Sequence, residues 1–249
     1  MTKQDNIFAE ATQAIGDFNF GKQTAEVFDD MLDRSVPLYQ ELQRMLGEIA
    51  GEFAESGSNV YDLGCSTGIT LETLRGAITA AGKQVHMVGL DYSQPMLDRA
   101  GDRFAGLPED ERPQLIHADL NQGCVVENAS VVVLNLTLQF VRPLYRSRLI
   151  RRIADGLNEN GCLILVEKVL SNDSLLNRMF IKFYYDMKRR NGYSDTEIAL
   201  KREALENVLI PYRIEENVEM LKHNGFTEVD TFFKWYNFAG MLAVKKRSE

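Results

Sequence analysis

A turn of small residues follows an apolar run near residue 60 of this chain. The run 60–63 reads V-Y-D-L, and the turn after it reads G-C-S-T-G and ends at Gly68. Gly64 lets the backbone turn tightly, while Ser66 and Gly68 leave room for a ligand beside the amphipathic segment 69–78. A strand, a small-residue turn and a helix in this order are typical of a nucleotide-type pocket.

The spacing of this turn separates classes of nucleotide ligand. It does not follow the G-x-G-x-x-G pattern of dinucleotide sites, and no lysine follows it to make a phosphate-binding P-loop. A ligand without a pyrophosphate therefore fits better, and S-adenosylmethionine is such a ligand. Its ammonium can meet an acid or backbone carbonyls, and its ribose can meet the next acid along the chain.

Acidic residues stand at the ends of three short apolar runs. Asp62 lies in the first run, Asp91 ends the run 84–90, and Asp119 follows the segment L-I-H-A. A carboxylate has two oxygens that only accept hydrogen bonds, so Asp91 can bind both ribose hydroxyls. Taken singly, Asp62 could be a turn or cap residue and Asp91 a helix N-cap. Open α/β sheets gather their strand ends at one edge, so the three acids together predict a nucleoside pocket.

Strands and helices alternate from residue 59 onward. The expected strands are 59–63, 84–90, 114–118, 130–135 and 161–167, and the expected helices are 69–80, 94–105 and 143–157. The stretch 226–244 reads as two further strands joined tightly. These patterns predict an α/β fold with a doubly wound, mostly parallel, seven-stranded sheet and an antiparallel C-terminal edge strand.

The residues before the alternation form a separate N-terminal region, 1–56. Residues 1–20 are polar with scattered aromatic side chains and read as an arm that needs a surface to dock on. Residues 36–54 have apolar side chains at helical spacing, which predicts a helix with Pro37 in its first turn.

Length, composition and charge limit the classes of function. The 249 residues are 45% apolar and 26% charged, which suits a single domain, 1–249, with an appendage. The net charge of −8 argues against direct binding of nucleic acid. No apolar run approaches the roughly 18 residues that span a bilayer, and no signal peptide is evident. Cys65, Cys124 and Cys162 lack metal-ligand spacing, so no metal site and a reducing, cytoplasmic location are expected.

A helical insertion at about 172–222 precedes the terminal hairpin. Ser194 and Glu197 have the spacing of a capping box, so a helix is expected to begin there. Glu197 and Lys201 are placed as an i,i+4 pair on the solvated side of that helix.

Arg202 falls on the other, apolar side of the expected helix. The apolar stripe is formed, at steps of four, three and four, by Ile198, Arg202, Leu205 and Leu209. Two interpretations stay open. The stem of Arg202 can lie on the core with its guanidinium in water, or the guanidinium can be a desolvated cation that binds an anion. Its planar fork matches a carboxylate bidentately, which a lysine would not.

Longer motifs extend along the whole chain. They are R-S-V-P-L-Y at 34–39, Y-D-L-G-C-S at 61–66, E-N-A-S-V-V-V-L-N-L-T-L-Q-F at 127–140, R-R-N-G-Y-S at 189–194, K-R-E-A-L-E-N-V at 201–208 and Y-N-F-A-G at 236–240. With these motifs the chain resembles the carboxy-S-adenosyl-L-methionine synthases, which have a class I, Rossmann-like methyltransferase fold. The combination is specific, because ordinary methyltransferases lack the insertion.

The resemblance implies a transferase that adds a carboxyl group to the methyl group of S-adenosylmethionine. The family uses prephenate as the second substrate and releases phenylpyruvate. Prephenate supplies both carbon dioxide and the base that removes a methyl proton, so no protein general base is required. Carbon dioxide formed beside the reacting carbon need not diffuse, which is a proximity effect. The product, which can co-purify, serves a separate enzyme that carboxymethylates a wobble uridine in tRNA; neither direct nucleic-acid nor membrane contact is implied for this chain.

The resemblance also assigns residues by matching position. It implies an S-adenosylmethionine pocket lined by Tyr39, Gly64, Cys65, Ser66, Asp91, Tyr92, Asp119, Leu120 and Asn135. Arg202 would be the catalytic residue: it would bind the new carboxylate and reach across a homodimer interface. Tyr92 stands where asparagine is expected in the family and could stack on the adenine. The insertion 172–222 would form a lid and dimer contacts that exclude water.

Two other functions are compatible with the strand ends alone. A conventional small-molecule methyltransferase would need no buried cation opposite the sulfonium, so the environment of Arg202 separates it from the first hypothesis. An S-adenosylmethionine-binding regulator or adaptor would instead expose an unpaired apolar face on the insertion.

Overall fold

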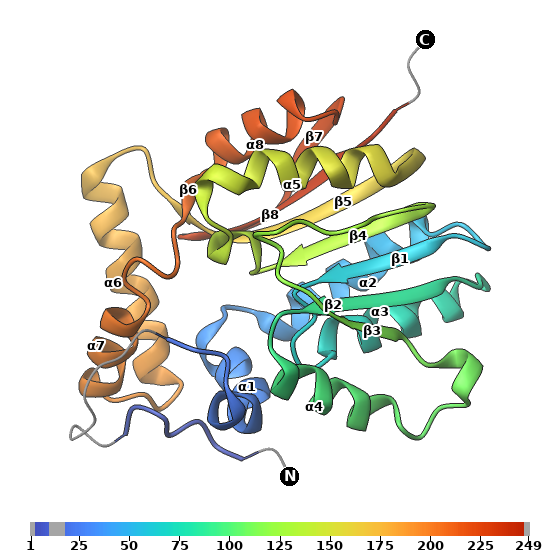
Figure 1. Ribbon diagram of the computed structural model, residues 1–249. Helices are drawn as coiled ribbons and strands as arrows, with labels where there is room; N and C mark the ends of the chain where they lie inside the picture. Colours follow the sequence, from blue (N-terminus) through green and yellow to red (C-terminus); the bar gives the residue numbers. More distant parts are fainter. Residues whose placement is uncertain (1–2, 10–17, 247–249) are drawn as a thin grey trace.

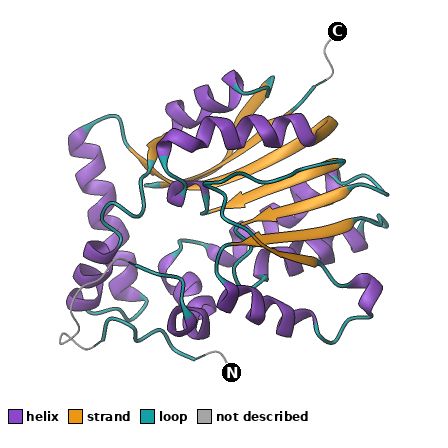
Figure 2. Cartoon of the chain, in the orientation of Figure 1, coloured by secondary structure: helices purple, strands orange, loops and turns teal. Residues whose placement is uncertain are grey.

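A mixed β-sheet runs through the centre of the chain, with helices on both of its faces (Figures 1 and 2). The computed structural model describes residues 3–9 and 18–246. Within these residues seven strands follow one another in the order β3-β2-β1-β4-β5-β8-β7. They are β1 (Asn59–Leu63), β2 (His86–Asp91), β3 (Gln114–His117), β4 (Ala129–Asn135), β5 (Leu157–Leu170), β7 (Glu228–Trp235) and β8 (Phe238–Val244).

The direction of the strands confirms the predicted fold class. Strands β1 to β5 pair in parallel, and β8 pairs antiparallel with both β5 and β7. The strand that runs against β1–β5 is β8, the last in the chain, and β7, which pairs with β8, forms the edge of the sheet. A two-residue strand that the sequence did not predict, β6 (Tyr212–Arg213), pairs in parallel with the end of β5. Strand β5 also extends beyond the predicted 161–167 at both ends: it begins directly after the preceding helix, and its last residues pair with β6.

Two layers of apolar side chains pack the helices onto the sheet. Helices α5 (Pro143–Gly156) and α8 (Ile214–His223) cover one face, and α2 (Tyr39–Phe53), α3 (Ile69–Ala80) and α4 (Gln94–Phe104) cover the other. In β4, Val132 and Leu134 belong to the first layer, while Val131 and Val133 belong to the second. A strand buried on both faces needs apolar residues at every position, which explains the continuous run in the sequence.

The N-terminal region differs in two ways from the sequence prediction. Helix α2 begins at Tyr39, and Pro37 lies before it, because Leu38 adopts a left-handed conformation with φ of 53°. A further helix, whose bounds were not predicted, is α1 (Lys22–Ser35), and it packs against α4. The arm does dock on a surface: Asp5 is buried, and Phe18 and Phe20 pack near α1. The remaining arm residues, 1–2 and 10–17, lie outside the described residues.

The insertion contains α6 (Ser174–Arg190) and α7 (Asp195–Ala204), which lie beside α1 at the carboxyl edge of the sheet (Figure 1). The predicted capping box is present at the start of α7. The hydroxyl of Ser194 accepts the N–H of Glu197 at 3.2 Å, and the carboxylate of Glu197 accepts the N–H of Ser194 at 2.7 Å. Among the helices that the structure describes, none is long and apolar enough to cross a bilayer.

Candidate active site

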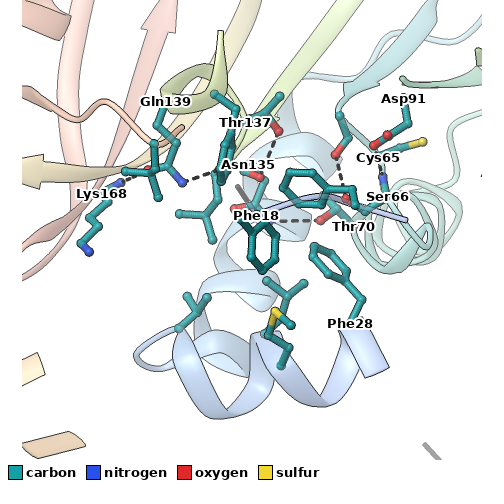
Figure 3. Close-up of a pocket in the computed structure, with 18 of the residues that line it drawn as sticks. Phe18, Phe28, Cys65, Ser66, Thr70, Asp91, Asn135, Thr137, Gln139 and Lys168 are labelled. Atoms are coloured by element: carbon teal, nitrogen blue, oxygen red, sulfur yellow. Dashed lines mark hydrogen bonds between the residues drawn. The ribbon is translucent and has the colours of Figure 1, made fainter. Parts of the chain in front are cut away.

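A cavity lies at the carboxyl ends of the parallel strands (Figure 3). Its volume is about 1370 Å³, including the open mouth. Of the ten residues assigned from the sequence, nine line this cavity and Arg202 does not. The nine are Tyr39, Gly64, Cys65, Ser66, Asp91, Tyr92, Asp119, Leu120 and Asn135. The structure therefore brings them together, and their contact with a nucleoside stays a prediction.

The turn after β1 has a backbone that small residues permit. Gly64, Ser66 and Gly68 adopt positive φ values of 86°, 49° and 83°. A Cβ atom on Gly64 would lie 2.4 Å from the side chain of Thr137, so glycine is required by both conformation and space. The thiol of Cys65 is buried in this turn, and burial raises its pKa, which keeps it protonated.

Asp91 ends β2 and holds the turn in place. Its Oδ2 accepts the N–H of Ser66 at 2.9 Å, and its Oδ1 accepts the N–H of Ser93 at 2.9 Å. Burial raises the pKa of Asp91, and the two N–H groups oppose that rise. Each carboxylate oxygen can accept a second hydrogen bond, so ligand hydroxyls could bind there as well.

Asp62 lies behind the cavity instead of lining it. Its side chain is buried, at 1% exposure, and neither carboxylate oxygen has a hydrogen-bond partner among the described residues. Burial raises its pKa to about 8, and the charge of Asp91 adds to the rise. Its charge acts on Tyr39 and Cys65, which do line the cavity. A buried carboxylate without a partner is costly, so this site favours a cationic ligand such as a sulfonium or an ammonium.

Asn135 and its neighbours form the floor of the cavity. The Nδ2 group of Asn135 and the Nε2 group of Gln43 each donate to the hydroxyl of Thr70 at 3.1 Å (Figure 3 shows the first). The side-chain oxygens of Asn135 and Gln43 have no partner among the described residues. Buried amide oxygens normally accept a hydrogen bond. The oxygen of Asn135, which lines the cavity, can therefore receive an N–H donor from a bound ligand.

Aromatic rings form the mouth of the cavity. The ring of Phe20 meets those of Phe18, Phe28, Tyr92 and Phe140 edge-on, with centroid distances of 5.1, 6.1, 5.9 and 5.2 Å. Tyr92 is 52% exposed, so its ring face is available to a planar ligand. The sequence analysis did not assign the phenylalanines of the arm. Their aromatic character in a polar segment was the only signal.

The motif L-N-L-T-L-Q-F forms a turn that a buried arginine holds. Arg146, on α5, donates to the carbonyl oxygens of Val141 at 2.8 Å, Ile210 at 2.7 Å and Gln139 at 3.2 Å. The side chain of Gln139 donates to the carbonyl of Leu136 and accepts the backbone N–H of Lys168 at 3.0 Å. These bonds fix the wall between β4 and β5.

The prediction that Arg202 lies on the buried face of α7 is wrong for the isolated chain. Arg202 is exposed, and its neighbour Lys201 is buried and lines the cavity. The inward positions of α7 are Ile198, Lys201 and Ala204, and the helix ends at Ala204. The predicted apolar stripe included Leu205 and Leu209, which lie beyond the end of α7. Including them put Arg202 on the buried face of the helix in place of its neighbour Lys201.

The predicted Glu197–Lys201 pair is also absent from the described residues. Glu197 caps Ser194 instead, and the ammonium of Lys201 lies 3.2 Å from the hydroxyl of Ser35 and 3.9 Å from the carboxylate of Asp5. Lys201 was therefore a site residue that sequence reasoning placed in solvent.

Comparison with known proteins decides the family. A family described as a methyltransferase domain matches residues 60–161. The carboxy-S-adenosyl-L-methionine synthase of Methylococcus capsulatus is 57% identical over 97% of this chain and 99% of its own length. The chain belongs to the carboxy-S-adenosyl-L-methionine synthase family. A second family member, from Aeromonas hydrophila, is 42% identical over 98% of this chain and 97% of its own length.

Solved structures of other proteins share the fold of this chain. An O-methyltransferase family protein from Burkholderia thailandensis has a TM-score of 0.66 at 16% identity, covering 100% of this chain and 64% of that one. Human N-acetylserotonin methyltransferase, solved in complex with S-adenosylmethionine, has a TM-score of 0.59 at 13% identity, covering 90% of this chain and 55% of that one. At these identities the likeness establishes the Rossmann-like methyltransferase fold.

Proposed function

We propose that this enzyme converts S-adenosylmethionine and prephenate into carboxy-S-adenosylmethionine, phenylpyruvate and water. In this reaction prephenate loses its ring carboxylate as carbon dioxide and its ring hydroxyl as hydroxide. The hydroxide takes a proton from the methyl group of S-adenosylmethionine to form water, and a carbon–carbon bond forms between that methyl carbon and carbon dioxide. We further propose that the product supplies a separate enzyme that modifies a wobble uridine in tRNA.

The observation that supports this proposal most directly is that one cavity has both an acidic and a basic side. Asp91 and Asp119 stand on the side of β2 and β3, and Lys168 and Lys201 stand on the side of β5 and α7. Figure 3 shows Asp91 and Lys168 on opposite sides of the cavity. The acidic side suits a cationic nucleoside, and the basic side suits an anionic substrate and a newly formed carboxylate.

The acidic side would hold S-adenosylmethionine through groups that are already oriented. Asp91 would accept the ribose hydroxyls, and Tyr92 with Phe20 would contact the adenine at the mouth. Asp62 would counter the positive charge from below, and the amide oxygen of Asn135 would accept an N–H group. Because Asp91 is fixed by two backbone N–H groups, little reorganisation is needed on binding.

The proposed role of Arg202, binding the new carboxylate, requires a second copy of the chain. Arg202 is exposed and does not line the cavity of its own chain. Helix α6 exposes apolar side chains that suit a symmetric interface, at Leu175, Leu176 and Met179. We therefore include a homodimer in the proposal, with α6 and α7 as its contact elements.

Mass spectrometry tests the reaction. Purified enzyme with S-adenosylmethionine and prephenate should form a nucleoside heavier by one carboxyl group that replaces a methyl hydrogen, together with phenylpyruvate. The same nucleoside is expected among ligands released from freshly purified protein. Transfer of an intact methyl group to an acceptor, with no carboxylated nucleoside, would instead identify a conventional methyltransferase.

A further inference from the structure

Lysine ammonium groups and tyrosine rings alternate on the basic side of the cavity. The Nζ atom of Lys168 lies 4.9 Å from the ring centroid of Tyr184. Lys188 Nζ lies 5.5 Å from the ring of Tyr184 and 5.3 Å from that of Tyr193. Lys201 Nζ lies 5.6 Å from the ring of Tyr193. The row joins β5, α6 and α7, and Lys168, Tyr184 and Lys201 line the cavity itself.

Among the described residues, this lysine row has less negative than positive charge beside it: the carboxylates of Asp5 and Glu197 act on Lys188 and Lys201. Lys201 is 3.9 Å from the carboxylate of Asp5, which also accepts the hydroxyl of Tyr193 at 2.5 Å. The ammonium groups of Lys168 and Lys188 form no hydrogen bond or ion pair with the described residues, and tyrosine rings lie beside them. Arg34 adds a further positive charge, with its Cζ 4.0 Å above the ring of Tyr193, and its guanidinium pairs with Asp30.

The alternative explanation, long stems that cover the core while their ammonium groups reach water, does not fit Lys188 and Lys201. Lys168 is half-buried and lines the cavity. Lys188 is 4% exposed and Lys201 is 7% exposed, so their ammonium groups are largely removed from solvent. Burial lowers the pKa of Lys188 to about 7 and those of Lys168 and Lys201 to about 8, and neighbouring lysines add to the fall for Lys188 and Lys201. Folding alone would favour apolar side chains at these positions.

We propose that Lys168 and Lys201 bind the anionic groups of a second substrate with two carboxylates, and that Lys188 adds positive charge from behind them. This inference rests on the proposed function, whose second substrate is such a dianion. The anion would supply the negative charge that the row lacks, so binding would replace an unfavourable set of buried cations with paired ones. The rings of Tyr184 and Phe238, 5.3 Å apart and both on the cavity wall, would contact the six-membered ring of that substrate.

Steady-state kinetics of single variants test this subsite. Lys168→Met and Lys201→Met keep a long side chain and remove the charge, while Lys222→Met on α8 is a matched control at an exposed position away from the cavity. Each cavity variant should raise the KM for prephenate at least tenfold and change the KM for S-adenosylmethionine less than threefold. Lys222→Met should leave both unchanged.

A binding measurement separates the subsite from the reaction. Calorimetric titration of prephenate into enzyme saturated with S-adenosylhomocysteine involves no turnover, and the cavity variants should bind at least tenfold more weakly than wild type. If wild type forms no carboxylated nucleoside but its prephenate binding still depends on Lys168 and Lys201, the proposed reaction fails and the subsite stands. Wild-type KM and wild-type affinity in both variants, with carboxylated product formed, would overturn the subsite. Failure of wild type to bind prephenate at all would overturn it too.

Discussion

Asp62 makes the free energy of unfolding depend on pH in a way that can be worked out from its surroundings. Burial raises its pKa from an ordinary 3.8 to about 8. Because the folded chain favours the protonated acid, the contribution of Asp62 to stability is complete below pH of about 4 and is lost as pH rises toward 8. One pH unit within this window corresponds to about 1.4 kcal/mol. Between pH 5.5 and 7.5 the loss should therefore be on the order of 2–3 kcal/mol.

The substitution Asp62→Asn removes this titration with little change in side-chain size. Urea unfolding of both proteins without ligand, at pH 5.5, 6.5 and 7.5, gives the free energies by linear extrapolation. The difference between the two proteins should shift in favour of the variant by about 1.4 kcal/mol for each pH unit. Glu167, whose pKa burial also raises to about 8, titrates in both proteins and cancels in the difference. A difference that stays constant with pH would refute the reasoning.

Ligand binding provides the second half of the same test. A cationic nucleoside near Asp62 favours its ionised form, so the affinity of wild type for S-adenosylmethionine should rise from pH 6 to 8 and then level off. Calorimetry in buffers with different ionisation enthalpies should detect proton release on binding below pH 8. Equal proton release in wild type and Asp62→Asn would exclude Asp62 as its source.

Three further substitutions test the site. Gly64→Ala places a Cβ 2.4 Å from Thr137 at a φ of 86°. It should weaken S-adenosylmethionine binding, measured by calorimetry, at least tenfold. The control Gly76→Ala, with no atom within 4 Å of its Cβ, should stabilise the chain by about 0.5–1 kcal/mol. Asp91→Ala removes a charged acceptor and should cost about 1.5–3 kcal/mol of S-adenosylmethionine affinity; unchanged affinity would reject its role. Arg202→Lys should abolish carboxylated product, measured by mass spectrometry, while nucleoside binding persists, and wild-type turnover would contradict its role.

Local sequence patterns were sufficient to predict the acidic side of the cavity. The apolar run before Gly64 and the helix after it begin and end where the sequence predicted, at 59–63 and 69–80. A strand, a turn and a helix that are adjacent in the chain need only short-range rules, because small residues set the turn and periodicity sets the elements. The same reasoning, applied to the next strand of the chain, predicted Asp91 as a residue of the pocket.

The burial of the Asp62 side chain could not be predicted in the same way. Its type and place at a strand end indicated a ligand-facing acid, but β1 has parallel neighbours on both sides and helices on both faces. The order of strands in the sheet, which no local pattern specifies, decides that this acid is buried, that it has no partner among the described residues and that its pKa is high.

The sequence by itself determined the fold class and the acidic side of the cavity, since each depends on residues a few positions apart. Only the tertiary structure decided the basic side, where Lys168, Lys188 and Lys201 arrive from a strand and two different helices. It also decided between Lys201 and Arg202. One residue along a helix turns the side chain by about 100°, and the packing of α7, not its composition, sets which of the two points inward.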